Sequence, residues 1–201
     1  MKELLGEFNQ QEISVLSLIT FRKKELEALC ASQIIDGKQF EVLETWLLPD
    51  YKDLSLKLLY RGSMDGMSGQ MFHEKCDGKG PTVTLIKCRF NGASSSSVIG
   101  GFVNQSWHSE NAWTSADKAF LFSITSGTLP IKCPILENKR GLAFYAYLGC
   151  GPRFGTGNDL GIKDDFKTGS ISPSSYSNSI ALCYNNEKNF AVEEIEAFQV
   201  Q

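Results

Sequence analysis

From residue 54 onward the chain is divided into short apolar runs, and this division limits the folds open to it. Glycine, asparagine, proline and serine separate the runs, as expected for turns between strands. The runs are SLKLLYR (55–61), TVTLIKCRF (82–90), VIGGFV (98–103), KAFLFSIT (118–125), LPIKCPIL (129–136), GLAFYAYLG (141–149), SIALCY (179–184) and VEEIEAFQV (192–200). Strands this short and this numerous are typical of packed antiparallel sheets. We therefore expect an α+β chain that is mainly β, with two antiparallel sheets packed as a sandwich and short flanking helices.

The first 48 residues have a helical pattern instead. Apolar residues recur near helical spacing, first at Leu16, Ile19, Leu26 and Cys30 and again at Phe40, Leu43 and Leu47. Asp36-Gly37 interrupts the pattern and Pro49 ends it. Heptads are not sustained, so a helical hairpin packed on the main domain is favoured over the end of a coiled coil. We assign residues 1–45 to a helical N-terminal extension and residues 46–201 to the main domain.

One more short helix is predicted over MSGQMFHEKC (67–76). Ser68 has the chemistry of an N-cap, and Phe72 and Cys76 lie on the same predicted face. On this reading His73 falls on the polar side of the helix, where it is solvated. His73 and His108 are the only histidines, and neither lies in a zinc-binding motif, so we expect no metal site from them.

Charge and cysteine content exclude several classes of protein. The 201 residues carry 20 basic and 23 acidic side chains, a net charge of −3, so no broad basic field for nucleic acid is predicted. No apolar stretch approaches the ~20 residues of a membrane span. The six cysteines form no C-x-x-C pair, and the acidic, broken N-terminus does not look like a signal peptide. We expect a cytoplasmic monomer with reduced thiols, no membrane insertion and no cofactor.

The most conspicuous segment is GCGPRFGTGNDLGI (149–162). Its glycines do not have the dinucleotide-binding spacing, and no phosphate-binding loop sequence is present. Asn158 and Asp159 precede further aspartates but lack the spacing of a calcium loop. We therefore interpret Gly151, Gly155 and Gly157 as turn-forming residues, at least one of them at positive φ. Asp159 is expected to hold the turn by bonds from its side chain to the backbone, with Arg153 exposed.

Two other features carry candidate chemistry. Trp107 and Trp113 bracket a short polar loop, and such aromatics either anchor a partner or cover a sheet edge. We expect Trp107 to be largely buried. Cys150 lies near Arg153 in a loop, which makes it the best candidate for a redox-reactive thiol. No paired nucleophile and base can be identified, so we assign no catalytic residue.

The order of segments resembles that of the TLDc domain family from about residue 46 to residue 201. The most specific matches are LLYRGSMDGMS with its F-H-x-K-C continuation, and GGFVNQSW. Gly100 and Gly101 match the family's glycine pair, Trp107 its tryptophan, and residues 149–160 its glycine-rich turn. The resemblance implies a sandwich of two antiparallel sheets and no established catalytic residue or cofactor. It also implies a link to protection against oxidative damage, and several members of the family bind the vacuolar proton-pumping ATPase.

Three hypotheses about function follow. The first is a non-enzymatic interaction module that acts on another assembly or on the vacuolar proton-pumping ATPase, whose cytosolic sector would recruit it to endolysosomal or vacuolar membranes. The second is a thiol-dependent antioxidant enzyme that uses Cys150 or Cys76, although paired cysteines for recycling are missing. The third is a sandwich that binds a sugar or a metal at the acidic loop between Asp159 and Asp165.

Overall fold

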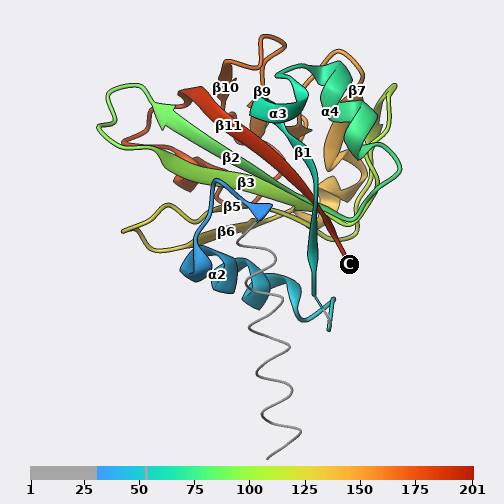
Figure 1. Cartoon of the computed structure of the whole chain (residues 1–201), viewed down its shortest axis with the longest axis horizontal. Coiled ribbons are helices and arrows are strands. Elements are labelled where there is room, and N and C mark those ends of the chain that lie inside the picture. Colours follow the sequence, from blue (N-terminus) through green and yellow to red (C-terminus); the bar gives the residue numbers. More distant parts are fainter. Residues whose placement is uncertain (1–30, 53) are drawn as a thin grey trace, which may run out of the picture.

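A computed structural model describes residues 31–52 and 54–201 of the chain (Figure 1). The helices and strands, with short 3-10 helices written η, are α2 Gly37–Leu47, β1 Leu56–Arg61, α3 Gly62–Asp65, α4 Gly69–Cys76, β2 Thr82–Phe90, β3 Ser97–Val103, β4 Glu110–Thr114, β5 Ala119–Ser123, β6 Ile131–Pro134, η1 Glu137–Leu142, β7 Phe144–Tyr147, β8 Arg153–Phe154, β9 Leu160–Ile162, β10 Thr168–Ser170, η2 Ser179–Leu182 and β11 Asn189–Val200. The prediction of a mainly β chain with few, short helices is confirmed.

The strands form one antiparallel sheet of eleven strands instead of two separate sheets. Its order is β4-β7-β8-β9-β10-β11-β2-β3-β5-β6, and β1 also pairs with β11. The long strand β11 explains the single sheet. Strand β10 pairs with the first residues of β11, up to Ala191, and β1 pairs with its last residues, up to Val200. The strands expected in two sheets are therefore joined by hydrogen bonds through β10 and β11.

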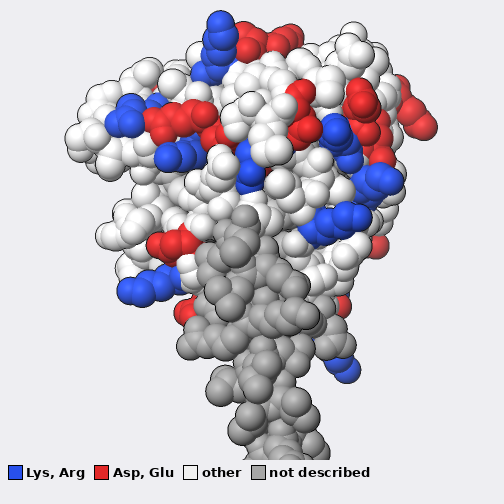
Figure 2. All heavy atoms as spheres, in the orientation of Figure 1, with Lys and Arg blue, Asp and Glu red and all other residues white. Residues whose placement is uncertain are grey.

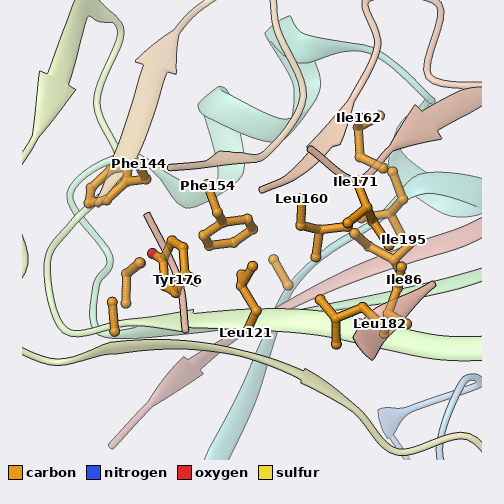
Figure 3. Packing of buried hydrophobic residues seen from close by; sticks show 14 of the residues in the cluster. Ile86, Leu121, Phe144, Phe154, Leu160, Ile162, Ile171, Tyr176, Leu182 and Ile195 are labelled. Atoms are coloured by element: carbon orange, nitrogen blue, oxygen red, sulfur yellow. The ribbon is translucent and has the colours of Figure 1, made fainter. Parts of the chain in front are cut away.

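The main core lies between two parts of this sheet (Figure 3). Phe144, Phe154 and Leu160 project from β7, β8 and β9 toward Leu121 of β5 and Ile86 of β2, and all five side chains are fully buried. The two parts therefore pack face to face, as the sandwich prediction requires, although the backbone bonding is continuous.

Helix α2 covers the other face of the sheet. Phe40, Leu43 and Leu47 are buried against β2, β3 and β5, which confirms the helical spacing predicted for them. Burial of each such side chain contributes about 1.5–3 kcal/mol. Asp36 is the N-cap of this helix and forms a capping box with Gln39, so the predicted break is the helix start. The earlier prediction for Leu16, Ile19, Leu26 and Cys30 lies outside the described residues.

One predicted strand is wrong. The run 179–184 begins with η2, because Asn178 has a left-handed conformation at φ 55° and Cys183 N–H bonds back to the carbonyl of Ile180. A run of six apolar and polar residues cannot by itself distinguish a strand from a tight turn. The strands β8, β9 and β10 were not predicted, because each has only two or three residues. Strand β4 was not predicted either, because a register shift interrupts its five residues.

Candidate functional site

The glycine-rich turn connects β7 to β9, and one of its glycines has a backbone that other residues avoid. Gly155 has φ +72°, which confirms the expected positive φ, and its N–H donates to the carbonyl of Ala143 at 2.8 Å. A Cβ at this position would lie 2.1 Å from a carboxylate oxygen of Asp159. Gly151 and Gly157 are required for close packing instead, since a Cβ there would lie 2.9 Å from Ile162 and 2.6 Å from the Ser172 carbonyl oxygen.

Asp159 is fully buried and is the hub of this region. Its carboxylate accepts backbone N–H groups of Ser174, Ser175 and Tyr176 at 2.8–3.0 Å and the hydroxyl of Ser179 at 2.9 Å. The predicted bonding from side chain to backbone is therefore present. It reaches across to residues 174–179 instead of closing the turn on itself. Because these donors occupy the buried carboxylate, its role is to hold residues 174–179 against the turn.

The remaining acidic side chains of this loop do not converge on a site. The prediction that Arg153 is exposed is wrong, because its side chain is only 22% exposed in β8, where it donates to Asp164 at 2.5 Å. Asp165 accepts the N–H groups of Lys167 and Thr168, and the bond from Lys167 lowers its pKa. Within residues 31–52 and 54–201, no group of three His, Cys, Asp or Glu side chains is placed to hold a metal ion.

The described cysteines lie in settings that disfavour the thiolate. Burial raises the pKa of Cys150, and the opposing effect of Arg153 is smaller. Burial also raises the pKa of Cys76 and Cys88, and raises that of Cys133 to about 11. Since the thiolate is the reactive form, these thiols are poorly suited to redox chemistry at neutral pH.

Trp107 and the glycine pair are packing residues of the main core. Trp107 is 1% exposed, as predicted, and its indole N–H donates to the hydroxyl of Thr82 at 3.0 Å. Its ring lies 4.7 Å from that of Phe144, centroid to centroid. A Cβ at Gly100 would lie 2.1 Å from the carbonyl oxygen of Thr84, and one at Gly101 would lie 2.6 Å from the ring of Phe154.

The prediction that His73 is solvated is wrong. His73 is only 1% exposed, because α4 turns this side chain toward the rings of Phe72 and Trp107. Its Nδ1 lies 2.7 Å from Asp77, which also accepts the hydroxyl of Ser109 at 2.6 Å. The carboxylate lies between the histidine and the serine, whereas a hydrolytic triad requires the histidine in the middle.

Trp113, unlike Trp107, is exposed, and it lies on a strand at the end of the sheet. We define the β4 surface as Trp113, Tyr145, Tyr147 and Leu148. Trp113 is 39% exposed, Tyr147 43% and Leu148 46%. Trp113 is directly opposite Tyr145 across β4 and β7, and their ring centroids lie 5.0 Å apart. Within the described part of the chain, no other strand pairs with the outer edge of β4.

Sequence reasoning identified both tryptophans but not their separation by the sheet. The strand ENAWT has five residues and a register shift near Asn111, so its alternation is too short to detect. The sequence pattern therefore predicts only that Trp107 and Trp113 flank one polar loop. The structure places Trp107 in the core and Trp113 on the surface.

A buried ion pair was also missed. Arg61 in β1 donates to Glu196 in β11 at 2.7 Å, and Glu196 is fully buried. Glu196 also accepts the hydroxyl of Ser32 at 2.6 Å and the N–H of Gln33 at 2.9 Å, so it ties the chain before α2 to the sheet. In an alternating strand such charges are expected to face solvent, so no local pattern predicts this contact.

Comparison with known proteins gives one family. Residues 30–201, most of the chain, match the TLDc domain. A search of curated proteins finds no match. Among the described helices, none combines the length and apolar character needed to cross a bilayer. The TLDc family is linked to resistance to oxidative stress. Because the match covers the buried tryptophan, the glycine pair and the Asp159 turn, the chain belongs to the TLDc domain family.

Proposed function

We propose that this chain is a non-enzymatic interaction module that serves oxidative-stress resistance by binding the cytosolic sector of the vacuolar proton-pumping ATPase. It works in the cytoplasm and is recruited to vacuolar or endolysosomal membranes through that complex. The observation that carries the proposal is the β4 surface, where exposed aromatic side chains lie beside an unpaired strand.

Exposed aromatic side chains at a free strand edge favour binding to a protein. Tyrosine and tryptophan are enriched among the residues that carry most of the energy of protein interfaces. An unpaired strand also offers a row of N–H and carbonyl groups to an added strand. In the β4 surface the two features coincide, since Trp113 belongs to the edge strand itself and packs on Tyr145 of the next strand.

The alternative functions find less support in the geometry. A thiol-dependent antioxidant enzyme needs an accessible thiolate, and burial raises the pKa of both Cys150 and Cys76. A metal or sugar site at the acidic loop needs free carboxylates. Asp159 is bonded to residues 174–179, and Asp164 is paired with Arg153.

The proposal is tested by measuring capture of the purified cytosolic sector of the ATPase by the immobilised chain. We expect Trp113→Ala to weaken capture by about thirtyfold or more, the effect of losing an interface aromatic. Tyr184→Ala is the matched control, because Tyr184 is 40% exposed and precedes β11, outside the β4 surface. This control should bind as the wild type does.

Two results would contradict the proposal. Capture that is absent in the wild type refutes the partner, and equal loss in Trp113→Ala and Tyr184→Ala refutes the surface.

A separate assay addresses enzymatic activity. Peroxide consumption in the presence of a thiol reductant should be the same for the wild type and for a variant that lacks all six cysteines. Clear turnover by the wild type alone would support the thiol-dependent enzyme.

A further inference from the structure

A cavity of about 300 Å³ opens where the C-terminal end of α2 meets β5 and β6. In Figure 1 this helix lies beneath these two strands. We call the cavity the α2 pocket. The residues that matter for its chemistry are Trp46, Phe102, Phe120, Lys132, Arg140 and Asp117. Its lining thus combines aromatic rings with charged groups. Such a lining suits a ligand that has both an apolar part and a charged part.

Lys132 is held at the pocket by aromatic contacts. Its ammonium lies 4.3 Å from the ring centroid of Phe120 and 5.9 Å from that of Trp46, and it donates to the carbonyl of Trp46 at 3.5 Å. These contacts fix the position of the cation but do not neutralise it. Partial desolvation lowers the pKa of Lys132, and the smaller opposing effect of the Asp50 carboxylate does not cancel it.

The charges around Lys132 leave an excess of positive charge. Asp50 is paired with Lys118. Neither Lys132 nor Arg140 forms an ion pair with any carboxylate of residues 31–52 and 54–201, and Asp117 is the one acidic lining residue without a cationic partner there. Two unpaired cations thus face one unpaired carboxylate. The whole chain has a net charge of −3, and Figure 2 shows both signs interspersed on one face, so attraction for an anion must be local.

The end of β4 lies close to the pocket along the chain. The chain leaves β4 at Thr114 and reaches the pocket at Asp117, only three residues later. The N–H of Ala116, between them, donates to the carbonyl of Arg140 at 3.0 Å, so this connection is anchored to the pocket wall. Three residues span at most about 11 Å, so a partner that pairs with β4 ends close to the α2 pocket.

We propose that the α2 pocket binds an acidic peptide segment of the protein partner. A carboxylate of the peptide lies between Lys132 and Arg140, and an adjacent aromatic or apolar side chain packs on Trp46. This inference rests on the proposed function and adds the chemistry of the bound segment. It concerns a contact distinct from Trp113, and it can be tested with a peptide alone.

The test uses nuclear magnetic resonance titration of the full chain, labelled with 15N, with the peptide acetyl-Glu-Glu-Phe-Glu-Glu-amide at low salt. We expect saturable shifts of the Trp46 indole N–H and of the backbone amides of residues 117–120. The peptide acetyl-Gln-Gln-Phe-Gln-Gln-amide should bind about tenfold more weakly, because it lacks the charge-assisted bonds.

Two variants separate the site from general electrostatics. The double variant Lys132→Gln with Arg140→Gln should lose about tenfold in affinity for the glutamate peptide. Lys139→Gln is the control, because it removes one positive charge next to Arg140, against two in the double variant, from a residue that does not line the pocket. Its affinity should equal that of the wild type. Thermal unfolding of each variant establishes that it is folded.

The proposal is overturned if the glutamate peptide causes no saturable shift at Trp46. It is equally overturned if the glutamine peptide binds as well, or if Lys139→Gln loses as much affinity as the double variant. The result is independent of the ATPase. Peptide binding without capture of the ATPase refutes the proposed function and leaves the pocket in place, whereas capture without peptide binding refutes the pocket alone.

Discussion

The two edge strands of the sheet, β6 and β4, differ in whether another segment covers them. At the β6 end, Ser177 N–H donates to the carbonyl of Pro134, and Leu136 N–H donates to that of Ser175, so residues 175–177 cover the strand end. At the β4 end, nothing in the described residues pairs with the outer edge, and Trp113 is left in solvent. Exposed edges invite association and are normally covered. This difference is the basis for the proposal that a partner binds at the β4 edge.

Asp159 connects the glycine-rich turn to the segment that covers β6. Its carboxylate binds the N–H groups of Ser175 and Tyr176, which belong to the segment that covers β6. Gly155 allows the carboxylate to reach them, because any Cβ there would collide with it. The turn therefore closes one edge of the sheet, and this structural role requires neither a phosphate nor a metal.

The largest effect on stability is expected for Trp107, the core residue that packs against β7, the neighbour of β4. Trp107→Ala removes a fully buried ring that contacts Phe144 of β7, and it should lower the free energy of unfolding by about 3–5 kcal/mol. Equilibrium denaturation in urea measures this change. A variant as stable as the wild type would show that Trp107 is an exposed residue like Trp113.

The next effect concerns the covered edge. Asp159→Ala leaves four donors of residues 174–179 without their buried acceptor, and it should cost about 2–4 kcal/mol. Release of this segment also uncovers β6, so the variant should self-associate in size-exclusion chromatography coupled to light scattering. A monomeric variant of unchanged stability would refute the role assigned to Asp159.

A smaller effect is expected at the turn. Gly155→Ala should cost about 1–3 kcal/mol, since its φ of +72° is unfavourable for alanine and the added Cβ crowds Asp159. Gly141→Ala is the control, because a Cβ there meets nothing within 4 Å and its φ is not positive. Thermal unfolding compares the two variants. Equal melting temperatures would contradict the conformational role of Gly155.

The smallest effect is expected for Arg153→Ala. The ion pair of Arg153 with Asp164 is on the surface, since the Asp164 side chain is 71% exposed, and such pairs are typically worth about 0–1 kcal/mol. Isothermal titration with ATP, GTP and inorganic phosphate checks the rival interpretation. Micromolar binding that Arg153→Ala abolishes would make the turn a phosphate site.

The sequence was sufficient to predict the longer strands and the buried face of α2. The runs at 82–90 and 98–103 correspond to β2 and β3, and Phe40, Leu43 and Leu47 are buried as their spacing requires. The joining of all strands into one sheet could not be predicted, since it depends on the three-residue strand β10 and its pairing with β11. Local patterns do not encode such distant pairings.

In the candidate site, too, some features could be predicted from local sequence and others could not. The positive φ in the glycine-rich turn and the burial of Trp107 follow from local rules of backbone geometry and core packing. The partners of Asp159, fifteen to twenty residues away, and the burial of His73 and Glu196 depend on tertiary contacts. His73 lies in helix α4 and Glu196 in the long strand β11, and only the assembled fold reveals that both side chains lie inside.

The central claim, that the β4 edge is free for a partner while the β6 edge is closed, is tested most directly by hydrogen–deuterium exchange. The chain is measured by mass spectrometry alone and with the purified cytosolic sector of the vacuolar proton-pumping ATPase. We predict slower exchange in residues 110–114 and 145–148 of the complex, and unchanged exchange in residues 155–159 and 174–179. Protection of residues 174–179 with no change in residues 110–114 would contradict the claim.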